Sequence, residues 1–399
     1  EAITRLSGIA DAFVVHDREI LVRCDDSVVM MAMNQPYMIR RSRGYAPRPT
    51  PLGETLPAVL ALGAHLKSTV CIVKEDKAFL SPHIGDLETP LARDFFHETL
   101  DLMQRIARLR PDVLACDMHP GYYSTRVAET SGASLVIRIQ HHHAHVVSCM
   151  AEHRIRGPVI GIAMDGTGYG EDGTVWGGEF LAADEMAFTR MAHLRYLPLP
   201  GGDAAIRNPW RFACCVLADA LGEEWQESAS RLGVLPENMP FDHIEAMLRS
   251  KVNSPLTSSL GRMFDAVSVM LGLKKTVSFE GQAAAMLEAA ARRGEGKVLP
   301  YAVQKENGAW VLDLSPCVRT IAESAASSKD MPYLAASFHA TLIESFAHTA
   351  GLIRDDTDLD RVVLSGGCFQ NIILLQGCVK RLERDGFTVF FHRMVPAND

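Results

Sequence analysis

The chain has 399 residues, of which 47% are hydrophobic and 22% are charged, and its formal net charge is −8. This length and apolar content are enough for more than one folded core. The negative charge argues against a general nucleic-acid coat and against a protein that binds anionic membranes. No apolar run is long enough to cross a bilayer, and the first residues do not form a signal peptide. We therefore expect a globular protein with neither a nucleic-acid nor a membrane partner.

Nine cysteines are scattered along the chain, and no two of them form a CxxC pair. This pattern is typical neither of a disulfide framework nor of a zinc finger. Buried thiols in a reducing compartment are the simpler interpretation, so we expect a cytoplasmic protein. The chain does not begin with methionine, which favours a piece of a longer protein.

The first fifty residues combine short strand patterns with a basic loop. Strands are predicted at residues 13–15, 20–23 and 27–30. Arg40, Arg41 and Arg43 then lie close together before a glycine, and arginine side chains bind phosphate or carboxylate groups with two parallel hydrogen bonds. A solvated basic loop is an equally good interpretation of these arginines. Prolines between residues 47 and 57 predict a linker or a domain boundary.

From about residue 56 onward, helical and strand patterns alternate. Helices are predicted at residues 56–66, 91–109, 213–220 and 258–271. Strands are predicted at residues 69–73, 77–81, 112–117, 135–139, 159–165 and 361–365, with the first two forming a hairpin. Several of these strands run directly into aspartate or glycine. The alternation is typical of an α/β fold whose ligand sites lie at the ends of strands.

Four histidines within five residues form the most informative stretch of the chain. His141 and His145 are four residues apart, so a helix would place both on one face, about one turn apart. Two imidazoles at this spacing commonly hold a divalent transition metal. The alternative is a surface histidine cluster or a core histidine with solvated neighbours. Asp165, followed by Gly166 and Gly168 after the next buried strand, favours a metal or phosphate site.

Three later turns are candidates for nucleotide binding. Gly366 and Gly367 follow a buried strand, and glycines there let backbone N–H groups approach a ligand closely. Asp265 lies near the start of a predicted helix, where its carboxylate could bind ribose hydroxyls. Glu280 is predicted in the first turn of another helix. Each signal is weak alone, because an acid in a first helical turn is also an ordinary response to the helix dipole.

Seven sequence blocks occur together in a characteristic order: QHHHAH, MDGTGYGEDGTVWGGEF, GGDAAIRNPWR, GRMFDAVSVMLGL, FEGQAA, LSGGCFQN and PAND. This order resembles the HypF family of hydrogenase maturation carbamoyltransferases and covers essentially the whole chain. The resemblance implies a two-lobed α/β fold like that of actin, Hsp70 and sugar kinases over residues 58–399. Residues 1–50 resemble only the end of a YrdC-like adenylation domain, and residues 51–57 would form the linker.

The resemblance also implies specific ligands. A divalent metal, zinc or iron, would be held by His141, His145 and Asp399, with Asp165 as a further contact and as the third ligand if Asp399 does not reach. His141, His145 and Asp165 would also take the catalytic roles. ATP or carbamoyl-adenylate would lie next to the metal, and Mg²⁺ is a further candidate. The matching nucleotide positions are Asp265, Glu280, Gly366, Gly367 and Asn371.

The implied activity is carbamoyl transfer. In the family, carbamoyl phosphate is cleaved and the carbamate is adenylated with ATP. The metal-bearing domain then passes the carbamoyl group to the C-terminal cysteine of HypE, where it becomes the source of a cyanide ligand of nickel–iron hydrogenase. We therefore expect HypE as a partner and carbamoyl phosphate and ATP as substrates. Because only the end of the adenylation domain matches, we expect the chain alone not to use carbamoyl phosphate.

Three other functions share part of this pattern. In small-molecule O-carbamoyltransferases the YrdC-like domain follows the metal domain, whereas here the matching segment precedes it. The tRNA threonylcarbamoyl transferase lacks such an N-terminal extension. A non-catalytic, actin-like nucleotide-binding scaffold is the third alternative, and the intact histidines and acids count against it.

Overall fold

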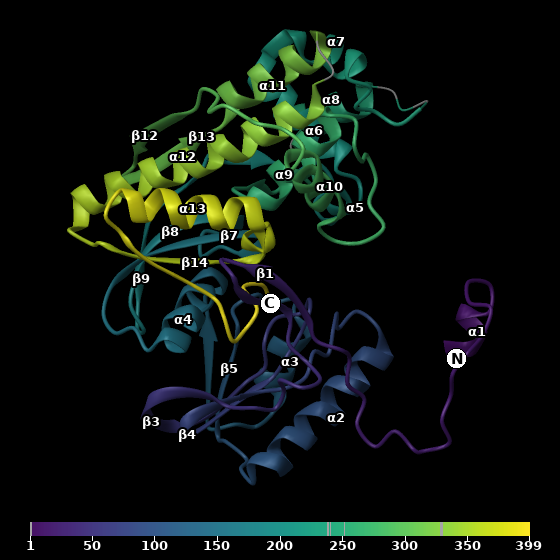
Figure 1. The fold of residues 1–399 in the computed structure, drawn as a ribbon, viewed down its shortest axis with the longest axis vertical. Helices are drawn as coiled ribbons and strands as arrows, with labels where there is room; N and C mark the ends of the chain where they lie inside the picture. Colours follow the sequence, from purple (N-terminus) through teal and green to yellow (C-terminus); the bar gives the residue numbers. More distant parts are fainter. Residues whose placement is uncertain (1, 238, 240, 251, 328–329) are drawn as a thin grey trace.

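The computed structural model describes residues 2–237, 239, 241–250, 252–327 and 330–399. Its lower lobe in Figure 1 contains a four-stranded sheet. The strand order is β4 (Cys71–Leu80), β3 (Thr50–Ala61), β5 (Val113–Asp117) and β6 (Leu135–Ile139). Strands β3, β5 and β6 are parallel, and β4 is antiparallel to β3. The helices of this lobe are α2 (Pro90–Ala107) and α3 (Tyr123–Thr130).

The larger sheet lies above this lobe and has nine strands within the described residues. Its main path is β12 (Ala302–Glu306), β13 (Ala309–Asp313), β9 (Phe188–Leu194), β8 (Val175–Ala183), β7 (Val159–Tyr169), β14 (Arg361–Ser365) and β15 (Thr388–Phe391). Two short strands, β10 (Leu197–Pro198) and β11 (Leu256–Thr257), pair with each other, and β11 also pairs with β8. Strand β7 is antiparallel to β8 and parallel to β14.

Helices cover both faces of the larger sheet, with α4 (His141–His153) on one face (Figure 1). The helical layer beyond the other face contains α5 (Asp203–Arg207), α6 (Trp210–Leu221), α7 (Trp225–Arg231), α8 (Phe241–Ser250), α9 (Leu260–Met270), α10 (Gln282–Ala291), α11 (Ser315–Ser327), α12 (Met331–Thr357) and α13 (Ile372–Arg384). The 3₁₀ turn η1 (Gly222–Glu224) joins α6 to α7, and the 3₁₀ turn η2 (Gly367–Gln370) joins β14 to α13.

The side-chain alternation along β7 divides the apolar core into two parts. Ile160 and Ile162 belong to the large cluster formed with the helical layer. Val159 and Ala163 belong to a separate cluster that packs against α4. Successive side chains of a strand point to opposite faces, so a strand that is apolar throughout must be covered on both sides. This burial places the carboxyl end of β7 directly beside α4.

The N-terminal segment begins with α1 (Ala2–Leu6) and extends away from the rest of the molecule (Figure 1). It returns as the hairpin of β1 (Val28–Ala32) and β2 (Gln35–Arg40). Tyr37 is 1% exposed in this hairpin, and its hydroxyl donates to the carbonyl oxygen of Phe369 at 3.2 Å. The hairpin is therefore packed against the large lobe.

Several local predictions for the first 81 residues are wrong. Residues 13–15 and 20–23 do not form strands, whereas the strand predicted at 27–30 corresponds to β1. Residues 56–66 are wrongly predicted to form a helix, whereas the assignment of residues 51–57 as a linker between domains remains a prediction. Both ranges overlap β3, which lies between two other strands of its sheet. The register with β4 shifts on both sides of Leu56, so Pro57 lies at an irregularity of the pairing. A proline has no N–H to donate and would disrupt a regular ladder of hydrogen bonds.

The hairpin predicted for residues 69–81 is also wrong, because β4 runs without interruption from Cys71 to Leu80. Glu75 lies between the two predicted strands and has a positive φ of 54°. A single left-handed residue bends the strand, and pairing with β3 continues on both sides of it. The other predicted strands and helices occur close to their expected positions, and the α/β fold class is confirmed. The domain boundaries remain predictions.

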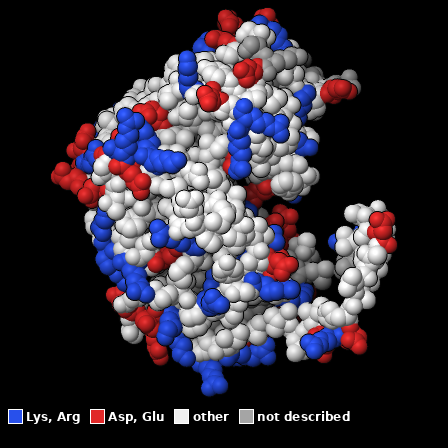
Figure 2. Space-filling model, viewed as in Figure 1, with Lys and Arg blue, Asp and Glu red and all other residues white. Residues whose placement is uncertain are grey.

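Acidic and basic side chains are interspersed over the face shown in Figure 2. This face therefore does not present an extended field of one sign. Among the described residues, no helix combines the length and the apolar character that crossing a bilayer would require.

Candidate metal and nucleotide site

Helix α4 brings the two spaced histidines together. Gln140 caps its N-terminus, because the side-chain oxygen accepts a hydrogen bond from the N–H of His143 at 2.8 Å. The Nε2 atoms of His141 and His145 lie 3.2 Å apart, and both side chains are buried. The helix expected from the sequence is confirmed, and its first two turns present two imidazoles to one point.

Two carboxylates converge on these imidazoles. Asp399 Oδ1 lies 3.2 Å from His141 Nε2 and 3.4 Å from His145 Nε2. Asp165 Oδ2 lies 3.4 Å and 3.7 Å from the same two nitrogens. The four residues each offer one ligand atom, and all four atoms lie within 4.8 Å of one another. The structure thus joins β7, α4 and the C-terminal loop in one cluster.

The chemistry and spacing of this cluster fit a divalent transition metal. Two imidazole nitrogens and two carboxylate oxygens are donors that zinc and iron accept. Metal–ligand bonds of 2.0–2.1 Å in a tetrahedron place neighbouring ligand atoms about 3.3 Å apart. The separations between the histidine nitrogens and the carboxylate oxygens, from 3.2 to 3.7 Å, lie close to that value. The residues present therefore fit a bound metal.

Asp117 orients the first histidine. It ends β5, and its Oδ2 lies 2.8 Å from His141 Nδ1. A histidine that donates Nδ1–H to a carboxylate keeps its Nε2 lone pair available for a metal. A strand that ends in this carboxylate is predicted from the sequence, but a role for Asp117 is not. The contact with His141 follows from the pairing of β5 and β6. These strands are adjacent and parallel, so their carboxyl ends bring Asp117 close to the residues after Ile139.

The charges in the cluster stabilise one another in the absence of a cation. Burial alone would lower the pKa of His141, but the charge of Asp399 and the hydrogen bond to Asp117 raise this pKa well above its usual value. Burial would raise the pKa of Asp165, but its hydrogen bonds to His141 and His145 hold the pKa well below its usual range. A metal must displace the proton that this arrangement favours on the histidines, so acid should oppose metal binding.

Next to Asp165 lies a cavity of about 450 Å³, a volume in the range of small-molecule sites. Its lining includes five of the predicted nucleotide residues: Gly166, Asp265, Glu280, Gly367 and Asn371. Asp265 is 3% exposed and forms an ion pair with Arg262 at 3.0 Å. Burial raises the pKa of Asp265 to about 6, and the charge of Arg262 limits the rise.

Two other residues of the cavity are already paired with groups of the protein. Glu280 lies two residues before α10 and pairs with Lys67, so its predicted place in a first helical turn is wrong. The side chain of Asn371 caps α13, where its Oδ1 accepts from the N–H of Leu374 at 3.0 Å. A role for Lys67 is not predicted from the sequence, because its partner Glu280 lies more than 200 residues further along the chain.

Two predicted nucleotide glycines are required by packing. Gly366 has a φ of 98°, and a Cβ on it would lie 2.3 Å from the carbonyl oxygen of Met164. A Cβ on Gly168 would lie 2.4 Å from a ring carbon of His142 and 2.7 Å from a ring carbon of His141. Gly367 has a different role, since its N–H donates to Asp165 Oδ1 at 3.0 Å. These glycines hold the strands and the turn close to the metal cluster.

The three predicted anion-binding arginines do not lie together. Arg40 and Arg41 line a second cavity of about 540 Å³, whose lining also includes Asp399, Lys67 and Glu280. One terminal nitrogen of Arg41 donates to backbone carbonyl oxygens of its own loop. Arg43 is instead exposed, and its side chain contacts a backbone carbonyl and an aspartate of residues 24–26. The structure thus brings two of the three arginines near the cluster.

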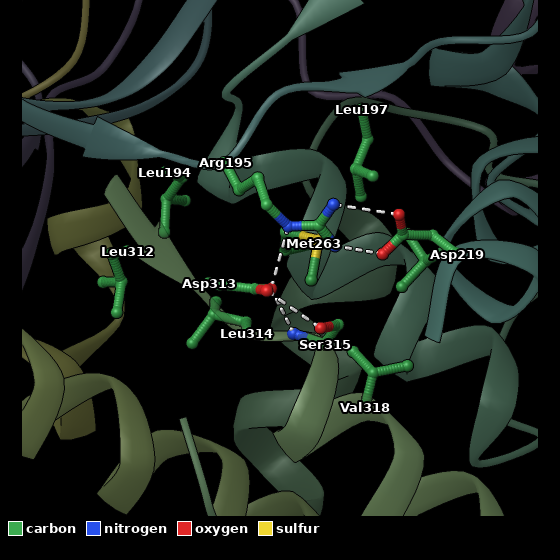
Figure 3. Close-up of a pocket in the computed structure, with 11 residues that line it drawn as sticks. Leu194, Arg195, Leu197, Asp219, Met263, Leu312, Asp313, Leu314, Ser315 and Val318 are labelled. Atoms are coloured by element: carbon green, nitrogen blue, oxygen red, sulfur yellow. Dashed lines mark hydrogen bonds and ion pairs between the residues drawn. The ribbon is translucent and has the colours of Figure 1, made fainter. Parts of the chain in front are cut away.

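A further pocket beneath β9 is structural (Figure 3). Arg195 contacts both carboxylate oxygens of Asp219, and its Nε lies 3.0 Å from Asp313 Oδ1. This ion-paired group occupies the middle of the pocket, and the remaining volume of about 20 Å³ is enough for roughly one water molecule. The ion pairs of Arg195 therefore connect the end of β9 with α6 and with the end of β13. The pocket has no room for a substrate.

Comparison with known proteins identifies the family. Residues 54–152 match the model described as the HypF Kae1-like domain. Residues 161–399 match the model described as carbamoyltransferase, Kae1-like domain, second subdomain. The chain belongs to the HypF carbamoyltransferase family. The predicted family assignment is therefore confirmed.

HypF relatives from several bacteria align with the whole chain. Carbamoyltransferase HypF2 of Cupriavidus necator is 40% identical, and the alignment covers 100% of this chain and 52% of the relative. Carbamoyltransferase HypF of Rhizobium leguminosarum bv. viciae is 38% identical, with 100% and 51% coverage. A shorter HypF homolog of C. necator is 36% identical over 87% of this chain and 91% of its own length. The chain spans about half the length of the first two relatives.

Solved HypF structures have the same fold. A crystal structure of full-length HypF in the phosphate- and nucleotide-bound form superposes with a TM-score of 0.92 at 40% identity, covering 100% of this chain and 52% of that one. The T. kodakarensis HypF structure gives a TM-score of 0.84 at 29% identity, covering 94% and 50%. These matches confirm that the described residues share the fold of the corresponding part of HypF.

Proposed function

We propose that this chain is the metal- and nucleotide-binding part of a carbamoyltransferase that passes a carbamoyl group from carbamoyl-adenylate to the C-terminal cysteine of HypE. The observation that carries the proposal is the convergence of His141, His145, Asp165 and Asp399 beside the cavity that contains Asp265. The carbamoyltransferase names of the relatives support the reaction class. Carbamoyl phosphate and ATP would be the original substrates of the longer enzyme.

The metal would be zinc or iron, with Mg²⁺ as a further ion that accompanies the nucleotide. His141 and His145 would bind it through Nε2, and Asp165 and Asp399 would each add a carboxylate oxygen. A bound metal would act as a Lewis acid for oxygen atoms of the carbamoyl or phosphate group. Asp117 would keep His141 in the tautomer that binding requires.

The protein groups around the cavity would bind and orient carbamoyl-adenylate. The carboxylate of Asp265 would accept hydrogen bonds from ribose hydroxyls, and the cation of Lys67 would lie on the side of the phosphate. The acceptor thiolate would then attack the carbamoyl carbon, and the bond from that carbon to the phosphate oxygen would break, releasing AMP. The buried walls would exclude water, which would otherwise hydrolyse the adenylate.

A cytoplasmic setting agrees with this chemistry. All nine cysteines are free thiols in the structure, and most of them are buried. Free thiols persist in reducing compartments, where the acceptor cysteine would also remain reactive.

Metal analysis of the purified chain tests the proposal. We expect about one equivalent of zinc or iron in the parent and a strong loss in His141→Ala, whereas His348→Ala, which changes an exposed histidine of α12, should retain the metal. The parent should then transfer the carbamoyl group from preformed carbamoyl-adenylate to a peptide with the HypE C-terminal sequence, detected by mass spectrometry with release of AMP. A chain that binds neither metal nor nucleotide would contradict the proposal.

A further inference from the structure

The loop that carries Asp399 is anchored by a buried side chain of α4. Glu152 lies seven residues after His145, two turns further along the same side of the helix. Its carboxylate accepts hydrogen bonds from the backbone N–H groups of Arg393 and Met394, both at 2.7 Å, and of Val395 at 3.4 Å. The side chain is 3% exposed. Hydrogen bonds from N–H groups to a buried carboxylate are charge-assisted and strong.

The same loop has a second attachment near the cluster. His392 Nε2 lies 2.8 Å from the hydroxyl of Ser365, at the end of β14, and His392 Nδ1 lies 3.6 Å from Glu152 Oε2. The N–H of Gly366 donates to the carbonyl oxygen of Ala397 at 2.9 Å. The loop is therefore held at residues 392–395 by α4 and at residue 397 by the turn that also holds Asp165.

We infer that Glu152 is a positioning residue of the metal site, which sets the loop so that Asp399 faces His141 and His145. One helix then carries both histidines and the anchor for the distant carboxylate, so the relative placement of three ligands depends on α4. This inference rests on the proposed metal function. Glu152 itself touches no ligand atom of the cluster, and it acts through the backbone of residues 393–395 and through the side chain of His392.

Metal affinity in a double-mutant cycle tests this inference. Zinc binding is measured by competition with a chromophoric chelator, and cobalt absorption spectra report the coordination, for the parent, Glu152→Gln, Asp399→Asn and the double variant. Loss of a group that supports a metal ligand typically weakens metal binding 10- to 100-fold, so we expect about that effect in Glu152→Gln. The double variant should bind no more weakly than Asp399→Asn, and both should share one cobalt spectrum.

Asp184→Asn is the matched control. The Asp184 carboxylate also holds a turn, by accepting from the N–H groups of Met186 and Ala187 at 2.8 and 2.9 Å, but it does not contact the Asp399 loop. This variant should bind zinc like the parent. If Glu152→Gln does not fold, Glu152→Asp, which keeps the charge, replaces it in the cycle with a smaller expected loss.

The outcomes separate the inference from the proposed function. Parent-like zinc affinity in the Glu152 variants would overturn the positioning role while leaving the metal site intact. Losses that add in the double variant would also overturn it, because Glu152 would then act by a route independent of Asp399. Failure of the parent itself to bind zinc or cobalt would overturn the proposed metal site and this inference with it.

Discussion

At the scale of single residues, Asp265 shows how burial adjusts an acid for binding. Its pKa of about 6 results mainly from desolvation, which disfavours the charged form, while the adjacent guanidinium of Arg262 favours it. The acid is therefore mostly ionised at neutral pH and mostly protonated in mild acid. A buried acid with a shifted pKa that lines a cavity is typical of a functional site.

Removing this carboxylate should weaken nucleotide binding. We expect Asp265→Ala to reduce the affinity for ATP or carbamoyl-adenylate by about 1–3 kcal/mol, the usual cost of losing a hydrogen bond to a charged group. Isothermal titration calorimetry measures the change. Glu344→Gln, which breaks an ion pair with Arg381 outside the cavity, serves as the control. Unchanged affinity in a folded Asp265→Ala chain would exclude the residue from the site.

Nucleotide affinity should also depend on pH through Asp265. The ionised carboxylate accepts hydroxyl hydrogen bonds, so affinity should fall as the pH is lowered from 7 to 5, with a midpoint near 6. Asp265→Asn should remove this component.

The effect of Asp265 on folding stability has the opposite pH dependence. Because the folded pKa lies above the unfolded value, this acid favours folding below about pH 4, and that contribution is lost as the pH rises through 6.

The two carboxylates of the cluster can be ranked as metal ligands. Asp399 Oδ1 lies closer to both histidine nitrogens than Asp165 Oδ2 does. We expect Asp399→Asn to lose most of the bound metal, measured by elemental analysis against the parent. Asp165→Asn should lose less. Full occupancy in Asp399→Asn together with loss in Asp165→Asn would show that Asp165 is the principal carboxylate ligand, although the metal site itself would stand.

At the scale of elements, the turn after β14 fixes the end of the larger sheet that carries Asp165. Gly366 adopts a φ of 98° and packs against the backbone of β7, and Gly367 donates to Asp165. The same turn binds Ala397 of the C-terminal loop. Two carboxylates from distant parts of the chain thus depend on one short turn.

Gly366→Ala should therefore be strongly destabilising. Gly386 is a suitable control, because it has a similar φ of 86° but open space around the position of a Cβ. Gly386→Ala should cost about 1–2 kcal/mol from backbone strain alone. Gly366→Ala should cost more, because its Cβ would also meet a backbone oxygen of Met164. Urea unfolding measures both changes, and equal losses would contradict the packing role of Gly366.

At the scale of the whole molecule, the metal cluster lies where the two sheets meet. Asp117 at the edge of the smaller sheet holds His141, while Asp165 extends from the larger sheet and Asp399 from the loop after β15. A cation bound here would link elements from both sheets. Because the unfolded chain does not form this site, binding of the cation would stabilise the folded state.

Zinc should consequently raise the thermal stability of the chain. At a free concentration of 100 times the Kd, single-site binding stabilises the folded state by about 2.7 kcal/mol. Differential scanning calorimetry should show a higher Tm with zinc for the parent and little change for His141→Ala. His348→Ala, which changes an exposed histidine of α12, should respond like the parent. An equal rise in the His141 variant would mean that zinc acts elsewhere.

The sequence by itself determined the features that depend on neighbouring residues. Local patterns include the four-residue spacing of His141 and His145 and the strands that run into Asp117 and Asp165, and the structure contains each of them. The place of Asp399 could be named only through the family resemblance, since no local pattern connects it to residues more than 250 positions earlier.

Features that depend on long-range contacts can be recognised only in the folded structure. The strand β3 forms where a helix was expected, because pairing with β4 and β5 outweighs local preference. The roles of Lys67 and Glu152 likewise come from partners more than 200 residues away. Glycine is required at positions 168 and 366 because side chains or backbone of distant residues pack directly against them. Such contacts arise from the packing of sheets and helices, which a local sequence pattern does not encode.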